Sequence, residues 1–444
     1  MVETNSHTRS SLLTKNILAS FIVKGWSALV VLLMVPLTLK MLGIYSNGVW
    51  LTISGILMWV DFLDVGLGNG LRNAVANNVA KGEHEKVREA ISSAFFMLFV
   101  IVVPILMLLY AIIYNIDVYS ALGVSPTRIQ GLEDILATAV TLVCSTFILK
   151  SVGNFYMGMQ LPAVNNFFVC MGQTLALIIT YIAYLLGSNS LLVVVIINTA
   201  SPLFVWMLCV PYSFWIRYPQ YAPYIGGIKK EMSRSLFSTG MKFFVLQICA
   251  IVLFTSTNII ISRIFSPAEV TPYQVAYRYF SLLLVAFTII CMPFWNATTD
   301  AYARGEMEWI QHMSRKLDIV MAGIFIAMLL MIAVSKFVYG LWVGKEVEIS
   351  YDLSIAIGIY IFILIVSMRY SYLLNGMGVL KLQLIFTVVA TVVFLPLAWL
   401  VCHMFGTVVS LAWVMCSVHV PGLIVNVIQL KKVINGTATG IWLK

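Results

Sequence analysis

The chain has 444 residues, of which 61% are hydrophobic and 10% are charged, and its mean hydropathy is +0.96. A soluble protein carries roughly 25% charged residues, so this composition cannot supply a water-facing surface. Most of the surface must therefore face lipid. The formal net charge of +9 does not indicate a nucleic-acid partner, because the basic residues are placed as the topology of a membrane protein requires.

Apolar runs long enough to cross a membrane recur from one end of the chain to the other. A transmembrane helix needs about 20 predominantly apolar residues. The runs lie at 17–39, 47–65, 91–114, 135–157, 163–186, 190–215, 236–262, 273–295, 317–337, 350–374, 381–402 and 407–428. The connections between them are too short to hold a folded domain. We therefore predict an all-α polytopic membrane protein with about twelve transmembrane helices.

The distribution of Lys and Arg sets the orientation of these helices. With the N-terminus in the cytoplasm, seventeen of the 27 Lys and Arg residues fall in cytoplasmic segments, five in external segments and five within spans. Cytoplasmic loops of membrane proteins carry an excess of these residues. We expect both termini to be cytoplasmic.

An internal repeat suggests two halves. Residues 73–83, after the second predicted span, and 296–306, after the eighth, are identical at five of eleven positions. Two parallel six-helix bundles around a central cavity are a common transporter plan. The predicted organisation is an N-terminal half at 1–216, a cytoplasmic linker at 217–235, a C-terminal half at 236–430 and a cytoplasmic tail at 431–444.

Five cations lie within the predicted spans, where an ionisable side chain is costly and commonly faces a cavity or a partner. They are Lys24, Lys150, Lys242, Arg278 and Arg369. Long cationic side chains also reach the interface from several ångströms down, and for Lys150 and Arg369 both interpretations stay open. Lys24 and Lys242 sit at similar depth in the first helix of each half, which favours a cavity role. We hypothesise that these two ammonium groups clamp a phosphate group of the cargo.

Only two acids are assigned to the spans, namely Asp61 and Asp64. With Gly68 and Arg72 they follow the spacing i, i+3, i+7, i+11 and so share one helical face. The carboxylates either take part in coupling or gating, or anchor the cytoplasmic end of the helix to Arg72. The glycine run around Gly68 indicates close helix packing rather than a nucleotide loop, because no strand precedes it.

Cysteine and histidine patterns indicate neither a metal site nor a catalytic site. The seven cysteines all lie in apolar runs without a CxxC pair, as small core residues do. The five histidines show no spacing typical of metal ligands. We expect no metal, no cofactor and no enzymatic activity.

The segment from Trp50 to Arg72, followed by Lys81-Gly82-Glu83, resembles the polysaccharide flippase family of Wzx-type O-antigen transporters. These belong to the multidrug/oligosaccharidyl-lipid/polysaccharide exporter (MOP) superfamily. Length, predicted spans and the six-plus-six repeat agree with that family over the whole chain.

This resemblance implies translocation of undecaprenyl-pyrophosphate-linked oligosaccharide across the bacterial inner membrane by alternating access, as a step in lipopolysaccharide biosynthesis. It implies a cationic cavity, for which Lys24, Lys242, Arg278 and Arg369 are candidates of the right type. The implied partners are the lipid-linked oligosaccharide, membrane lipid and other polysaccharide assembly proteins.

Two alternatives stay open. A cation-coupled multidrug antiporter of the same superfamily tends to use acids in its first or seventh span, whereas these spans carry Lys24 and Lys242 and no acid. An integral membrane glycan polymerase is a different class of protein. The short external loops and the lack of a catalytic constellation argue against it.

Overall fold

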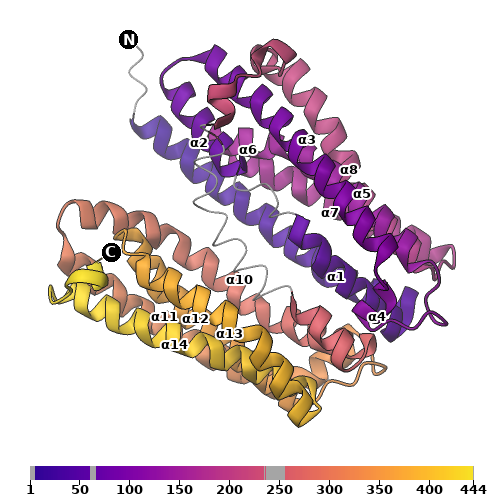
Figure 1. Ribbon diagram of the computed structural model, residues 1–444. Helices are drawn as coiled ribbons and strands as arrows, with labels where there is room; N and C mark the ends of the chain where they lie inside the picture. Colours follow the sequence, from indigo (N-terminus) through magenta and orange to yellow (C-terminus); the bar gives the residue numbers. More distant parts are fainter. Residues whose placement is uncertain (1–5, 61–66, 235, 237–255, 444) are drawn as a thin grey trace. The chain divides into compact units, whose positions relative to one another are not determined.

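The computed structural model describes residues 6–60, 67–234, 236 and 256–443, and over these residues the chain forms helices and turns without a strand (Figure 1). This confirms the predicted all-α class. The chain divides into two compact units, 1–251 and 252–444. The boundaries predicted for the two six-helix halves stay predictions.

The first unit is a bundle around α1, α5, α7 and α8. Its helices are α1 (Ser6–Val60), α2 (Leu67–Ala80), α3 (His84–Asn115), α4 (Val118–Leu122), α5 (Leu132–Leu149), α6 (Ser151–Gly158), α7 (Pro162–Leu185) and α8 (Leu191–Pro211), followed by the short turns η1 (Tyr212–Arg217), η2 (Pro219–Tyr221) and η3 (Ile225–Gly227). Helix α1 packs against α7, α5 against α3 and α8, and α2 against α3 and α6. A kink at Gly43, with φ 69° and ψ 172°, separates the first two predicted spans within α1, a conformation that glycine adopts without a Cβ clash.

The second unit is organised around α12. After a helical segment at 256–264, its helices are α10 (Pro267–Ala303), α11 (Met307–Trp342), α12 (Tyr351–Gly376), α13 (Lys381–Phe405), α14 (Val408–Ile434) and η4 (Gly440–Leu443). Helix α12 packs against α10, α11 and α14. Most of the predicted seventh span, 236–262, lies outside the described residues. In the predicted tail, Gln429 Nε2 donates to Trp442 O at 3.2 Å, so the chain end folds back on α14.

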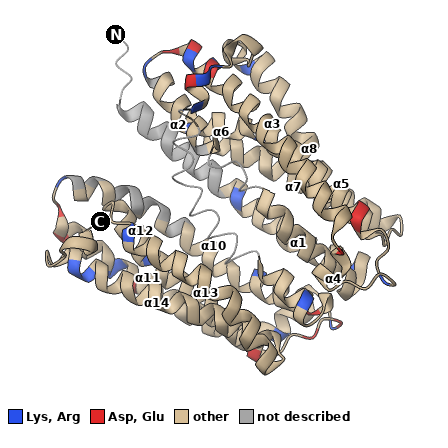
Figure 2. Ribbon diagram, in the orientation of Figure 1, with Lys and Arg blue, Asp and Glu red and all other residues tan. Residues whose placement is uncertain are grey.

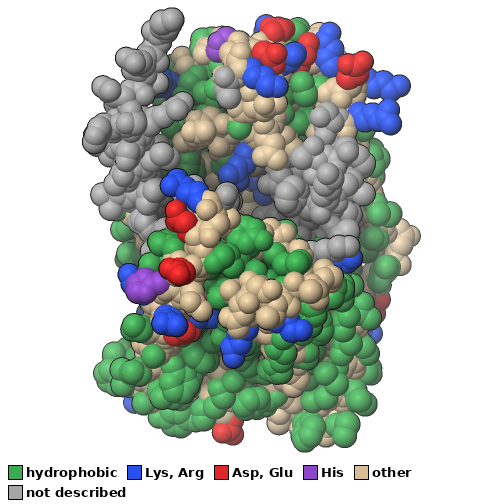
Figure 3. All heavy atoms as spheres, turned by 90° about the vertical axis from the view of Figure 1, so that its left-hand side faces the viewer, with side chains coloured by type: hydrophobic (Ala, Val, Ile, Leu, Met, Phe, Trp, Pro, Cys, Tyr) green, Lys and Arg blue, Asp and Glu red, His purple; other side chains and the backbone are tan. Residues whose placement is uncertain are grey.

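The surfaces of the helices match a lipid environment. Within the described residues, nine helices are long and apolar enough to cross a membrane. Outward-facing apolar side chains such as Met107, Met207 and Val392 are 66%, 55% and 68% exposed. Charged residues lie mainly near the ends of the described helices (Figure 2), and apolar side chains cover much of the lower part of the face drawn in Figure 3. Apolar surface of this extent is unfavourable in water, which confirms the prediction of a polytopic membrane protein.

The repeated segments 73–83 and 296–306 each end a helix with the same turn. Gly82 and Gly305 have φ of 72° and 76°, in the left-handed region. Each glycine N–H donates to the carbonyl three residues earlier at 3.1 Å, and the N–H of the next residue donates to the carbonyl five residues before itself at 2.9 Å. This pair of bonds is the Schellman motif that ends a helix. The repeat therefore encodes one turn geometry twice.

The described part of the predicted linker 217–235, residues 217–234, folds onto α3 of the first unit. Arg88 Nε donates to Ala222 O at 2.7 Å, and its guanidinium carbon lies 4.0 Å from the centre of the Tyr224 ring. The Tyr224 hydroxyl donates to Glu85 Oε1 at 2.6 Å, and this bond to a carboxylate raises the pKa of Tyr224. The segment is thus bound to α3 by polar contacts.

Candidate functional site

A cavity of about 620 Å³ lies inside the first unit, between α1, α5, α6, α7 and α8. Ligand pockets in proteins span roughly 300–1,000 Å³. The polar lining consists of Ser54, Thr146, Lys150, Asn154, Asn165, Gln173, Asn198 and Thr199. Aromatic walls come from Trp50, Phe168 and Trp206. A mainly apolar cavity with several convergent polar groups is typical of a ligand site.

A break between two helices places Lys150 in this pocket. Helix α5 ends at Leu149 and α6 begins at Ser151, with Lys150 at φ −65° and ψ −8°. The Gly153 N–H donates to Lys150 O at 2.8 Å, an i+3 bond that tightens the helix locally. The Lys150 ammonium lies 5.0 Å from the Phe147 ring centre. Among the described lining residues, Lys150 is the only one with a charged side chain.

Glycines let the helices around the pocket approach closely. A Cβ at Gly153 would clash with Asn165 Oδ1 and lie 3.2 Å from Trp206 Cη2. A Cβ at Gly172 would lie 3.0 Å from Pro202 Cα. Small residues at helix contacts allow such approach in membrane proteins. They bring the amide of Asn165 and the indole of Trp206 to the same cavity wall.

The structure does not bring the other predicted cations into this pocket. Lys24 lies exposed on α1, and Arg72 lies exposed on α2. Arg278 lies half-buried on α10 of the second unit. Three predicted residues lie outside the described residues, namely Lys242, Asp61 and Asp64. The lysine clamp and the acidic face therefore stay predictions.

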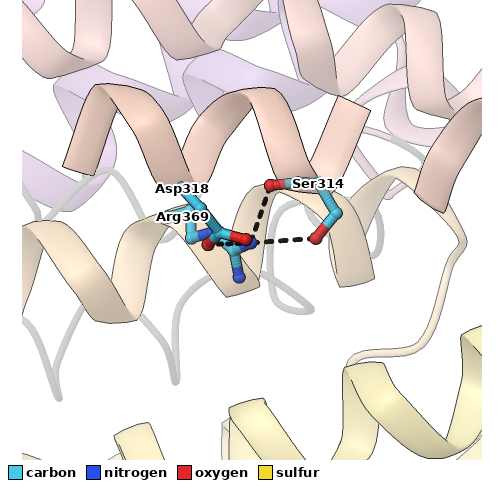
Figure 4. Close-up of polar contacts among 3 residues, drawn as sticks. All are labelled: Ser314, Asp318 and Arg369. Carbon is cyan, nitrogen blue, oxygen red and sulfur yellow. Dashed lines mark hydrogen bonds and ion pairs between the residues drawn. The ribbon is translucent and has the colours of Figure 1, made fainter. Parts of the chain in front are cut away.

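Arg369 already has partners on the neighbouring helix (Figure 4). Its side chain is 3% exposed, and Nη2 lies 2.6 Å from Asp318 Oδ1 on α11. The same nitrogen donates to Ser314 O at 2.8 Å and to Ser314 Oγ at 2.9 Å. This guanidinium ties α12 to α11, so we do not include Arg369 in the pocket site.

The ion pair also corrects one expectation. Asp318 lies in the predicted span 317–337 and Asp352 in the predicted span 350–374, so the prediction that Asp61 and Asp64 are the only acids within spans is wrong. The partner of Asp318, Arg369, lies 51 positions later on another helix, which no local pattern reveals.

Sequence reasoning also missed the amide side chains of the pocket. Asn154, Gln173 and Asn198 lie inside the predicted spans 135–157, 163–186 and 190–215. Polar residues inside apolar spans commonly face the bundle interior or a cavity. That signal was available in the sequence, but it was applied to charged residues alone.

Comparison with known proteins identifies the fold of this chain. No family model and no curated protein matches the chain. It is similar to the inward-facing structure of a multidrug resistance MATE family transporter of the MOP superfamily, with a TM-score of 0.77 and 14% identity over 92% of this chain and 96% of that one. An outward-facing structure of such a transporter gives a TM-score of 0.63 and 15% identity over 94% and 97%.

A third similar structure differs in its pocket. It is a MOP superfamily transporter from Pyrococcus furiosus, described as having a binding pocket of reverse polarity that suggests a different function. Its TM-score is 0.61, with 15% identity over 93% of this chain and 96% of that one. The closer resemblance to polysaccharide flippases stays a prediction. At these identities the likeness concerns the fold, and this chain has the fold of MATE transporters.

Proposed function

We propose that this chain is an alternating-access transporter that moves an amphipathic solute across a membrane. The observation that carries the proposal is the likeness to both inward-facing and outward-facing MATE structures over more than nine-tenths of each chain. The pocket in the first unit supplies a place for the solute among helices long enough to span a membrane. We also propose a location in a bacterial inner membrane with both termini in the cytoplasm.

The comparisons favour one function, the export of small molecules by cation-coupled antiport. Both MATE structures named above are described as multidrug resistance transporters. For this chain, such a function predicts efflux of lipophilic cationic dyes driven by a proton or sodium gradient.

Flipping of a lipid-linked oligosaccharide is the second candidate, and the charge of the pocket favours it. Lys150 lines the pocket, and no carboxylate does so among the described residues. The half-buried ammonium of Lys150 adds positive charge to the lining, which favours an anionic cargo over a cationic drug. The Pyrococcus furiosus transporter, described as having a binding pocket of reverse polarity that suggests a different function, supports a change of cargo within this fold.

Reconstitution into liposomes separates the two candidates. If the chain is an antiporter, ethidium moves across the bilayer when a proton or sodium gradient is imposed. If it is a flippase, a fluorescent polyprenyl-pyrophosphate-linked oligosaccharide becomes accessible to an external quencher without any dye transport. Liposomes without protein are the control, and failure to move either compound would contradict the transporter proposal.

The proposed topology predicts which residues an impermeant thiol reagent reaches. The six described cysteines are buried, and a variant lacking all seven provides a clean background. A cysteine at position 229 should label only in inverted vesicles, because this position is expected to be cytoplasmic. A cysteine at position 128, in the predicted external segment, should label in intact cells and serves as the control. Labelling at 229 in intact cells would overturn the orientation.

A further inference from the structure

We infer that residues 212–234, which we name the basic segment, form a docking surface for the headgroups of anionic phospholipids. The segment follows α8 and comprises η1, η2, η3 and the chain up to Arg234. The inference goes beyond the proposed transport and depends on neither candidate cargo.

The inner side of the basic segment is fixed on the first unit. Tyr221 is buried, and its ring centre lies 5.8 Å from that of Phe155 on α6. The Tyr224 N–H donates to Ser92 Oγ on α3 at 3.0 Å, in addition to the contacts of Tyr224 with α3 described above. Because these contacts fix the backbone, the side chains on the other side of the segment have a defined placement.

The outer side of the basic segment exposes large apolar side chains. Trp215 and Ile216 are 77% and 72% exposed, and Ile225 is 89% exposed. Trp215 and Ile216 lie at the end of the candidate membrane span Leu191–Arg217, whereas Ile225 lies eight residues beyond that span. Segments that lie on a membrane bury such side chains at the boundary between headgroups and acyl chains. The exposure of Ile225 therefore indicates that the segment lies against the bilayer.

Cationic side chains accompany these apolar groups. The basic segment contains four exposed cations and one acid, Glu231, which gives it a net charge of +3. None of the four cations forms an ion pair with a described residue. They are Arg217, Lys229, Lys230 and Arg234. Anionic headgroups attract clusters of Lys and Arg that lie next to a membrane span.

Two acids at the start of α3 have partners of their own. Glu83 Oε1 lies 3.0 Å from Lys86 Nζ. Glu85 accepts a hydrogen bond from the hydroxyl of Tyr224, and the guanidinium of Arg88 lies over the same tyrosine ring. These two carboxylates therefore do not neutralise the cations of the basic segment.

The apolar side chains decide among anionic partners. An acidic protein or a nucleic acid would pair with the cations but would leave Trp215 and Ile216 uncovered. A phospholipid satisfies both groups, because its phosphate pairs with the cations and its acyl chains cover the apolar side chains. The span that ends at Arg217 places Trp215 where tryptophan is enriched, at the membrane–water interface. An anionic phospholipid therefore fits this surface.

Fluorescence of the full-length chain in nanodiscs tests the inference. In a variant that lacks all seven native cysteines, I225C carries an environment-sensitive dye. The nanodiscs contain phosphatidylcholine with increasing fractions of phosphatidylglycerol, and we expect a blue shift of the dye relative to pure phosphatidylcholine. K229Q and K230Q should each raise the fraction of phosphatidylglycerol that gives half of this shift about fivefold, as expected for one lysine at an anionic surface.

The K81Q/K86Q variant is the matched control for K229Q/K230Q. Lys81 and Lys86 are exposed and lie outside the basic segment, on the same predicted side of the membrane. K81Q/K86Q should respond to phosphatidylglycerol as the parent does, whereas K229Q/K230Q should lose the response. Three results would each overturn the inference: no shift with phosphatidylglycerol, an equal loss of the shift in K81Q/K86Q, or the same shift when soluble polyglutamate is added to phosphatidylcholine nanodiscs. The last result would indicate an acidic protein as the partner.

Discussion

Replacement of Gly158 by alanine is expected to destabilise the first unit by about 1–3 kcal/mol, the range for overpacking a well-packed contact. Gly158 on α6 packs against α2, where a Cβ would lie 2.7 Å from Arg72 O and 2.7 Å from Val75 Cβ. The backbone oxygen cannot rotate away, so the two helices must separate. Thermal unfolding in detergent and the yield of monodisperse protein measure the effect.

Gly323 is the matched control for this substitution. It also lies in a long helix, α11, but a Cβ there would meet nothing within 4 Å. In water, alanine is the better helix former by about 1 kcal/mol, so G323A should be neutral or slightly stabilising. Equal stability of G158A and G323A would show that α2 and α6 are not in close contact.

The D318N substitution is expected to lower the stability of the second unit by about 2 kcal/mol. It removes the anionic partner that the described residues give the buried Arg369 guanidinium, which keeps its two bonds to Ser314 and its contact with the Tyr370 ring. Loss of one partner of a buried ion pair costs about 3–5 kcal/mol. Because the Asp318 side chain is 60% exposed, solvent weakens its share of the pair and reduces this figure. Thermal unfolding should therefore begin several degrees lower.

An exposed acid at the start of α12 controls for the loss of a negative charge. Asp352 lies in the first turn of α12, where its interaction with the helix dipole contributes about 0.3–1 kcal/mol. D352N should therefore unfold close to the parent. The double variant D318N/R369M should lose less than the sum of its single variants if the two side chains are coupled. Strict additivity would show that the pair contributes nothing.

The helices could be predicted because a membrane helix needs little beyond a continuous apolar run. For that reason the predicted span 91–114 falls inside α3, and 381–402 falls inside α13. The turn at Gly82 and Gly305 was visible as a repeat because a Schellman turn requires glycine at one fixed position. The kink at Gly43 was less evident, because the apolar runs on either side of it do not indicate the angle between the two helical segments.

The pocket could be predicted only in part. Lys150 was singled out because a charge in an apolar run is conspicuous. The amides of Gln173 and Asn198 converge only once α7 packs on α8, and this packing depends on contacts between residues about 30 positions apart, such as Gly172 and Pro202. Arg369 was equally conspicuous, but its partner Asp318 was not counted among the acids of the spans, although it lies inside the predicted span 317–337. Single residues were thus recognised where their chemistry was unusual, whereas their neighbours were not.

All lining residues of the pocket belong to the first unit, and this has a thermodynamic consequence. A rigid-body movement of one unit against the other leaves these contacts unchanged. A ligand with equal affinity for two conformations does not shift the equilibrium between them, however tightly it binds. A ligand held by this pocket alone would therefore be selected without driving the conformational cycle. The work of switching must come from groups that change partners between conformations, which makes selectivity and turnover separable by mutation.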